Sequence, residues 1–258
     1  MERCVGITVR QSDHWEFVAP YLPQLEYLTL ALRLPPPPGL GLQSTVKLKS
    51  LKIERPEYLP ACPTTILSHL QTELELCFSW FTTPRRELYR IASGATRVLR
   101  LHLNIITTPQ SPQSPQSHVG LLENTFFHKE CIFEQVTHLV LQYADDGLGH
   151  AVRHPFEVIQ APKLERLEIW LHNLRTIEGL ARVDYLTVTQ LIVVMSPLPS
   201  NPSDAFGSEC EAVLELIQSL PSLELLELTV PLEVMEKVRV ELRERNLCPY
   251  LSVIRHYY

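Results

Sequence analysis

Two adjacent carboxylates, Asp145 and Asp146, come closer than any other residues of this chain to an enzyme's acid–base pair. They follow an apolar segment that ends at Tyr143 and is typical of a strand, and α/β enzymes place their sites beyond the carboxyl ends of parallel strands. Gly147 comes directly after them, however, and two acidic residues before a glycine are more typical of a solvated turn. We therefore expect no catalytic residue here. The alternative is a small hydrolase-like α/β enzyme with its site near Asp145 and Asp146.

Two histidines, His150 and His154, are four residues apart and could share one face of a helix as metal ligands. Pro155 would interrupt that helix, and the sequence offers no third ligand, so we expect no metal site. The chain also lacks the G-x-S-x-G, H-E-x-x-H, P-loop and dinucleotide-binding motifs. We therefore expect no cofactor and no enzymatic activity.

The elements that would position any site follow a repeated apolar pattern. The segment Leu220–Val230 (LPSLELLELTV) shows it as L-x-x-L-x-L-x-Φ, an anchor followed by alternation with a period of two. Such alternation is typical of a strand with one buried face, and the spacing is that of the strand half of a leucine-rich repeat. Most copies follow one another at or near the ~20–29 residue period of such repeats. The second apolar slot of each copy, which we call the leucine slot, is occupied in turn by Ile7, Leu28, Leu51, Leu74, Leu101, Leu139, Leu167, Leu191, Leu226 and Leu251.

Two segments rich in Pro and Ser interrupt the repeat, at 107–117 (TTPQSPQSPQS) and 196–208 (SPLPSNPSDAFGS). Segments of this composition bury too little apolar surface to offset the entropy lost on ordering. We therefore predict two flexible surface inserts. Without them the two longest intervals between strands return to the period of the repeat.

Helical patterns lie between several of the predicted strands. One begins at Thr83 and Pro84 and ends at Gly94, a second is opened by a capping box at Ser208–Glu211, and a third spans Pro231–Arg245. Pro155–Gln160 is a weaker helical candidate.

Strands that alternate with helices are expected to be parallel. Because each strand alternates instead of being apolar throughout, only one of its faces should be covered by helices. We therefore predict an α/β fold, an irregular leucine-rich-repeat solenoid with a parallel concave sheet and with helices or loops on its convex side. We expect one domain over residues 1–258. An irregular α/β domain is the alternative.

Composition excludes several classes of function. The net charge of −6 disfavours non-specific binding of nucleic acid, which needs basic stripes. No segment approaches the ~20 apolar residues of a membrane span, and no signal peptide is evident at the start. The six cysteines are widely spaced, without a C-x-x-C pair, which favours free thiols in a reducing compartment. We therefore expect a soluble protein of the cytoplasm or nucleus that binds neither membranes nor nucleic acid.

The outward positions of the strands form the most informative candidate surface. Solenoids commonly bind partners on the exposed face of their stacked strands. In the later half of the chain that face combines apolar residues, an aromatic residue and a charged rim, which suits protein binding. An alternative is that a loop such as 196–208 covers it. The predicted protein-binding residues are Val140, Arg166, Glu168, Trp170, Ile192, Val194, Leu225 and Glu227.

The motifs LPQLEYLTLAL (Leu22–Leu32), APKLERLEIWL (Ala161–Leu171) and LPSLELLELTV (Leu220–Val230) resemble the leucine-rich-repeat region of fungal-type F-box proteins. The closing LRERNLCPYLSVI (Leu242–Ile254) is similar to the last helix and strand of such arrays. The F-box itself, a helical module that binds a ligase adaptor, is absent from this sequence. The resemblance implies capture of a substrate or regulator in ubiquitination.

Together these observations predict a non-enzymatic scaffold that binds a partner protein on its concave face. Besides the enzyme alternative, a truncated relative without a partner of its own is a third interpretation, because no capping unit precedes the first strand.

Overall fold

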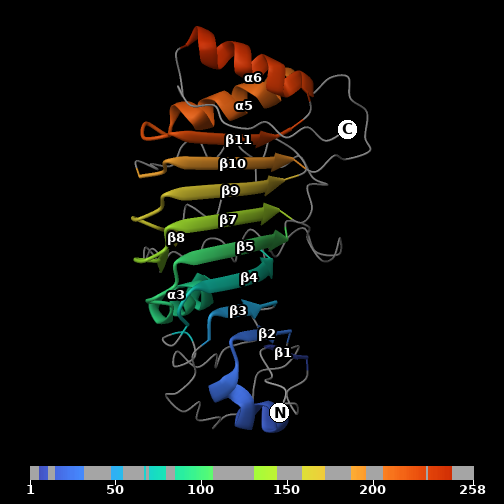
Figure 1. The fold of residues 1–258 in the computed structure, drawn as a ribbon, viewed down its shortest axis with the longest axis vertical. Helices are drawn as coiled ribbons and strands as arrows, with labels where there is room; N and C mark the ends of the chain where they lie inside the picture. Colours follow the sequence, from blue (N-terminus) through green and yellow to red (C-terminus); the bar gives the residue numbers. More distant parts are fainter. Residues whose placement is uncertain are drawn as a thin grey trace, which may run out of the picture. The chain divides into compact units, whose positions relative to one another are not determined.

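The computed structural model describes residues 6–10, 15–31, 48–54, 67, 70–79, 85–106, 131–143, 159–171, 187–195, 206–230 and 232–245. The chain forms two compact units. Unit 1 comprises Met1–Val136 and Val158–Pro162, and unit 2 comprises Thr137–Glu157 and Lys163–Tyr258. Figure 1 shows the strands and helices of both units, which are described separately below.

The described residues of unit 1 form five parallel strands that lie side by side in the order of the sequence. A separate pair of two-residue strands is also parallel. The five strands are β1 (Gly6–Val9), β2 (Tyr27–Leu30), β3 (Ser50–Ile53), β4 (Glu73–Ser79) and β5 (Arg100–Ile106), and the short pair is β6 (Cys131–Ile132) and β8 (Ile159–Gln160). The helices are α1 (Trp15–Val18), the 3-10 helix η2 (Ala19–Gln24) and α3 (Arg85–Gly94).

In the part of unit 2 that the structure describes, there are four parallel strands and two helices (Figure 1). The strands lie in the order β7 (His138–Tyr143), β9 (Arg166–Leu171), β10 (Gln190–Met195) and β11 (Leu225–Thr229). The helix α5 (Phe206–Gln218) precedes β11, and α6 (Leu232–Glu244) follows it and packs against α5. The prediction of parallel strands in an α/β fold is therefore confirmed.

The leucine slots of neighbouring strands lie in register. In unit 2, Leu139 pairs with Leu167, Leu167 with Leu191, and Leu191 with Leu226, and all four side chains are fully buried. The same holds in unit 1 for the row Ile7, Leu28, Leu51, Leu74 and Leu101, in which Ile7, on the first strand β1, is the one partly exposed member. Each unit therefore has one continuous row of slot residues in its core. The register predicted from the sequence is correct in both units.

A recurring backbone hydrogen bond fixes this register where each strand begins. The carbonyl of Thr137, two residues before a leucine slot, accepts the amides of Glu165 and Arg166, both at 2.9 Å. The carbonyls of Glu165 and Thr189 accept two successive amides of the following strand segment in the same way. In unit 1 the carbonyls of Glu26 and Thr72, at the same position of their copies, make the equivalent pairs of bonds. The copies therefore share a backbone geometry as well as an apolar pattern.

Several predicted boundaries differ from the structure. Helix α5 begins at Phe206, two residues before the start predicted at Ser208. The predicted insert 196–208 therefore includes three helical residues, 206–208, and its other residues and the whole of 107–117 lie outside the described residues. Ile159 and Gln160 form a strand, β8, because they pair with β6, so the helical candidate Pro155–Gln160 is wrong there. Helix α3 ends at Gly94 as predicted.

Packing explains why a glycine ends α3. A Cβ atom added to Gly94 would lie 3.0 Å from Cβ of Leu67, a buried residue, which is closer than ordinary van der Waals contact. The absence of a side chain at Gly94 therefore lets the end of α3 approach Leu67. Within the described residues, no helix has the length and apolar character needed to cross a membrane.

Candidate protein-binding face

The predicted site residues all lie in unit 2, at the strand positions that alternate with the buried leucine slots. We call these positions the outward face of unit 2. Strand pairing places them in three rows that run across β7, β9, β10 and β11. The first row is His138, Arg166, Gln190 and Leu225; the second is Val140, Glu168, Ile192 and Glu227; the third is Gln142, Trp170, Val194 and Thr229. The structure therefore brings the eight predicted residues onto one face of four neighbouring strands.

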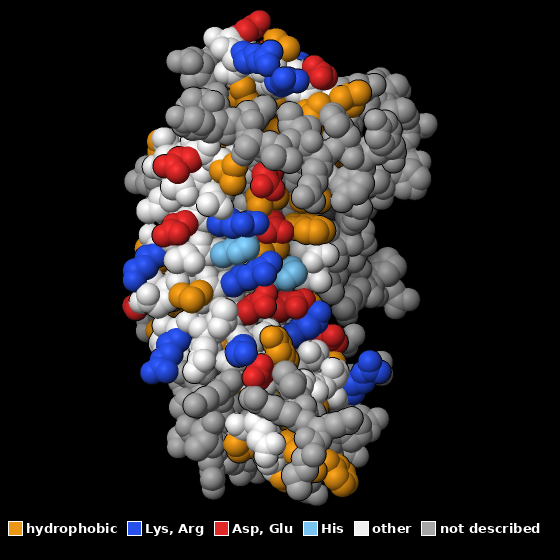
Figure 2. All heavy atoms as spheres, in the orientation of Figure 1, with side chains coloured by type: hydrophobic (Ala, Val, Ile, Leu, Met, Phe, Trp, Pro, Cys, Tyr) orange, Lys and Arg blue, Asp and Glu red, His pale blue; other side chains and the backbone are white. Residues whose placement is uncertain are grey.

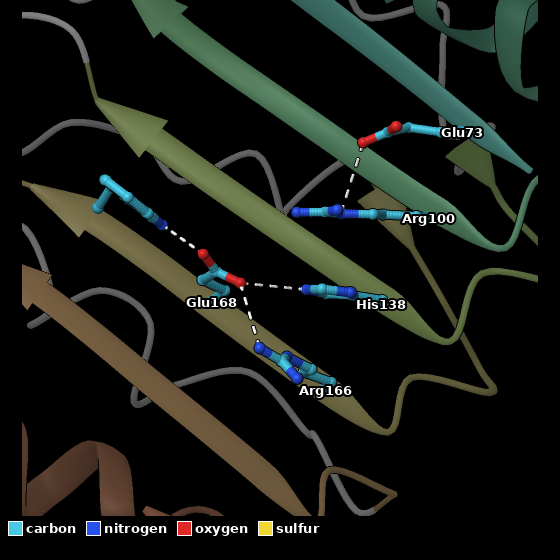
Figure 3. Close-up of polar contacts among 6 residues, drawn as sticks. Glu73, Arg100, His138, Arg166 and Glu168 are labelled. Carbon is cyan, nitrogen blue, oxygen red and sulfur yellow. Dashed lines mark hydrogen bonds and ion pairs between the residues drawn. The ribbon is translucent and has the colours of Figure 1, made fainter. Parts of the chain in front are cut away.

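Glu168 is the centre of a polar cluster on this face (Figure 3). Its Oε1 accepts a 2.6 Å hydrogen bond from Nε1 of Trp170, which lies two residues along the same strand. Its Oε2 lies 3.3 Å from Nε2 of His138 on β7 and 3.7 Å from Nη2 of Arg166 on β9. The carboxylate therefore links an aromatic ring, an imidazole and a guanidinium on two neighbouring strands.

These partners keep the Glu168 carboxylate ionised although it is buried. The hydrogen bond with His138 is the largest influence, and together with the Trp170 hydrogen bond and the charges of His138 and Arg166 it lowers the pKa of Glu168 to about 2. Burial acts in the opposite direction, because it disfavours the charged form. Glu168 thus carries a negative charge at neutral pH, and its three neighbours largely satisfy that charge.

Trp170 is the aromatic residue of this face. Its side chain is 42% exposed although its indole N–H is bonded to Glu168. A tryptophan that presents ring surface while its polar atom is satisfied has an orientation fixed before any partner binds. Val194, its neighbour in register on β10, is partly exposed and extends the apolar surface. This combination is typical of the anchor of a protein interface.

Two predicted members of the exposed apolar patch are buried instead. Val140 is 3% exposed and Ile192 is 7% exposed, whereas we expected both to face solvent. Both are short side chains that lie in register beside the longer Glu168, which separates them in the second row. Both side chains therefore pack beneath the exposed residues of this face. The apolar surface that a partner could contact comes from Trp170, Val194 and Leu225.

Glu227 differs from Glu168 in having no counter-charge among the residues that the structure describes. It is partly buried on β11, in register with Ile192, and no hydrogen bond or ion pair reaches it within the part of the chain that the structure describes. Arg166 is bonded only partly, because its Nε is buried without a hydrogen-bond partner while its Nη2 contacts Glu168. Counting only described partners, the face therefore has one satisfied carboxylate, Glu168, and one unsatisfied carboxylate, Glu227.

The corresponding face of unit 1 is polar and pairs its own charges. Nζ of Lys52 lies 2.8 Å from Oε1 of Glu75. Nε of Arg100 lies 3.5 Å from Oε1 of Glu73, a pair drawn in Figure 3. Figure 2 shows such charged side chains among apolar ones over the strands. Cys77, at the next outward position after Glu75, is a free thiol whose pKa burial raises to about 12. Because the thiolate is the nucleophilic form of cysteine, a raised pKa makes this thiol less reactive.

His138 belongs to the site, although the predicted set does not include it. It is thirty residues from Glu168 in sequence, and only the register of β7 with β9 reveals their proximity. Asp145, Asp146, His150 and His154 lie outside the described residues. Among the residues that are described, no group of three or more His, Cys, Asp or Glu side chains is arranged to hold a metal ion. Comparison of the chain with protein-family models and with curated proteins finds no match.

Proposed function

We propose that this protein is a non-enzymatic scaffold, built as an irregular leucine-rich-repeat solenoid, that binds a partner protein through the outward face of unit 2. The solenoid is supported by the in-register rows of leucine slots and by the recurring hydrogen bonds at the strand starts. Each copy of the pattern contributes one strand, and backbone hydrogen bonds at its start link it to the next copy. Repeat proteins likewise grow by stacking one structural unit per copy.

The observation that carries the proposed function is the state of Trp170. A large ring that is 42% exposed and held by a 2.6 Å hydrogen bond offers contact area at little entropic cost. Tryptophan is among the residues most enriched at the energetic centres of protein interfaces. The adjacent charged and polar groups would form the rim of such an interface.

The resemblance to the repeat region of F-box proteins extends this proposal. By that resemblance, the partner would be a substrate or regulator in ubiquitination, and the protein would act in the cytoplasm or nucleus. This extension is supported by the three quoted sequence motifs.

The test is quantitative affinity capture from cell extract with three forms of the full chain: wild type, Trp170→Ala and the control Val240→Ala. Val240 is 48% exposed on α6, away from the strands, so its substitution removes apolar surface without touching the proposed face. We expect a set of proteins that wild type and Val240→Ala retain and that Trp170→Ala loses. Truncating an interface tryptophan typically costs about 2 kcal/mol or more, which is roughly a 30-fold loss of affinity. If every captured protein is retained by a folded Trp170→Ala variant, this face is not the binding surface.

A further inference from the structure

The two carboxylates of the outward face of unit 2 differ in a way that bears on the chemistry of the partner. Glu168 is bonded by Trp170, His138 and Arg166, so its charge is balanced within the protein. Glu227 lies in the same row, yet no cation or hydrogen-bond donor reaches it among the described residues. Among the described residues, the unbalanced charge of this face is therefore negative.

The surroundings of Glu227 strengthen its attraction for a cation. It is partly buried, and its described neighbours include two apolar residues, the buried Ile192 in register on β10 and the partly exposed Leu225 on its own strand. Apolar neighbours lower the local dielectric constant, so a charge here interacts more strongly than one that is surrounded by water. A partner cation would give Glu227 the counter-charge that Arg166 gives Glu168.

We propose that the partner of this face is a basic peptide segment that places a lysine or arginine on Glu227 and an apolar side chain on Trp170. This inference rests on the proposed protein-binding function and specifies the chemistry of the partner. Complementarity of charge is its basis, because an acidic segment would add to an existing negative charge. The net charge of −6 of the whole chain acts in the same direction.

The register of the strands sets the spacing that such a segment needs. Trp170 and Glu227 are two strands and one row apart, because Trp170 is in register with Val194, and Val194 with Thr229, two residues after Glu227. With strands ~4.8 Å apart and a rise of ~3.3 Å per residue, their Cα atoms are separated by about 12 Å. In an extended peptide, residues four apart point to the same side and are about 13 Å apart. The basic and the apolar residue should therefore be four positions apart.

The test is selection of phage-displayed random twelve-residue peptides on the purified full chain. We expect selected peptides to carry Lys or Arg four positions from a large apolar residue and to bind Trp170→Ala at least tenfold more weakly. Glu227→Gln should weaken them by about threefold to fivefold, the effect of a partly exposed ion pair. Repeating the selection on Glu227→Lys should yield peptides with Asp or Glu in place of the basic residue.

The matched control is Glu236→Lys, which makes the same change of charge at an exposed position of α6. It should leave both the selected sequences and their affinities unchanged. Two outcomes would overturn this inference and leave the binding function intact. In the first, the selected peptides require Trp170 but bind wild type and Glu227→Gln equally. In the second, the selected peptides are acidic and depend on Arg166. Failure to select any peptide that requires Trp170 would contradict both the inference and the proposed function.

Discussion

Replacing Glu168 with glutamine tests the polar cluster that fixes Trp170. Glutamine keeps the size of the side chain and an oxygen that can accept the Trp170 hydrogen bond, but it removes the negative charge that His138 and Arg166 contact. The pKa of Glu168 falls from 4.5 to about 2 on folding. At about 1.36 kcal/mol per pKa unit, a shift of this size corresponds to an upper bound of about 3 kcal/mol. Because Arg166 is 41% exposed and its charge is screened by solvent, we expect a loss of about 1–2 kcal/mol at neutral pH.

The pH dependence separates this charge effect from a simple packing defect. Since folding lowers the pKa of Glu168, its stabilisation is fully present above pH 4.5 and is lost as the pH falls towards 2. The difference in unfolding free energy between wild type and Glu168→Gln should therefore shrink by about half between pH 6 and pH 3. Urea denaturation followed by circular dichroism at several pH values measures this difference. The matched control is Glu236→Gln on α6. A difference that is absent at pH 6, or that stays constant down to pH 3, would refute the account of the cluster.

Three further predictions concern the packing of each unit. Leu167→Ala, in the buried slot row of unit 2, should lower the free energy of unfolding by about 2–5 kcal/mol, as measured by urea denaturation. The control Leu232→Ala, at a position 57% exposed on α6, should change it by less than about 0.5 kcal/mol. Gly94→Ala should cost about 1–3 kcal/mol in the same assay, because its Cβ would press on Leu67, and a neutral result would contradict the close approach. The Cys77 thiol should resist iodoacetamide at pH 7.5 in the folded protein, because burial raises its pKa to about 12, and it should react after unfolding in urea. Mass spectrometry measures the labelling, and rapid labelling of the folded form would contradict the burial of the thiol.

The sequence allowed the strands and their register to be predicted because one pattern recurs. Aligning Leu139 with Leu167 and Leu191 is enough to place Glu168 beside Val140 and Ile192, and the structure has this pairing. A period of two identifies the buried face of a strand without knowledge of its neighbours.

Whether a side chain on the outward face is exposed depends on the side chains of the neighbouring strands. Alternation along a single strand carries no information about those neighbours, so it could not predict this exposure. Val140 and Ile192 have the pattern of outward residues, yet both are buried beside the longer Glu168. The link between His138 and Glu168 was likewise hidden, because it joins residues thirty positions apart through the pairing of two strands. The leucine slots would have been enough to place His138 on the strand next to Glu168. They could not have predicted the hydrogen bond between the two side chains.

The shortest strands and the start of α5 were predicted less well than the longer strands. The two-residue strands β6 and β8 are too short to show any periodicity, so the pattern gave no signal for them. The capping box at Ser208 pointed to a helix start, and α5 begins at Phe206, a difference of two residues that lies within the range by which assigned helix ends vary.

The measurement that tests the central claim most directly is site-specific photo-crosslinking in living cells. Benzoylphenylalanine is introduced in place of Val194, the partly exposed neighbour of Trp170 in register, or, as the control, in place of Val240 on α6. The adducts formed under ultraviolet light are identified by mass spectrometry. If the outward face of unit 2 binds a protein, position 194 should give discrete adducts that position 240 does not give. Equal adducts at both positions, or none at position 194 in a folded protein, would contradict the account.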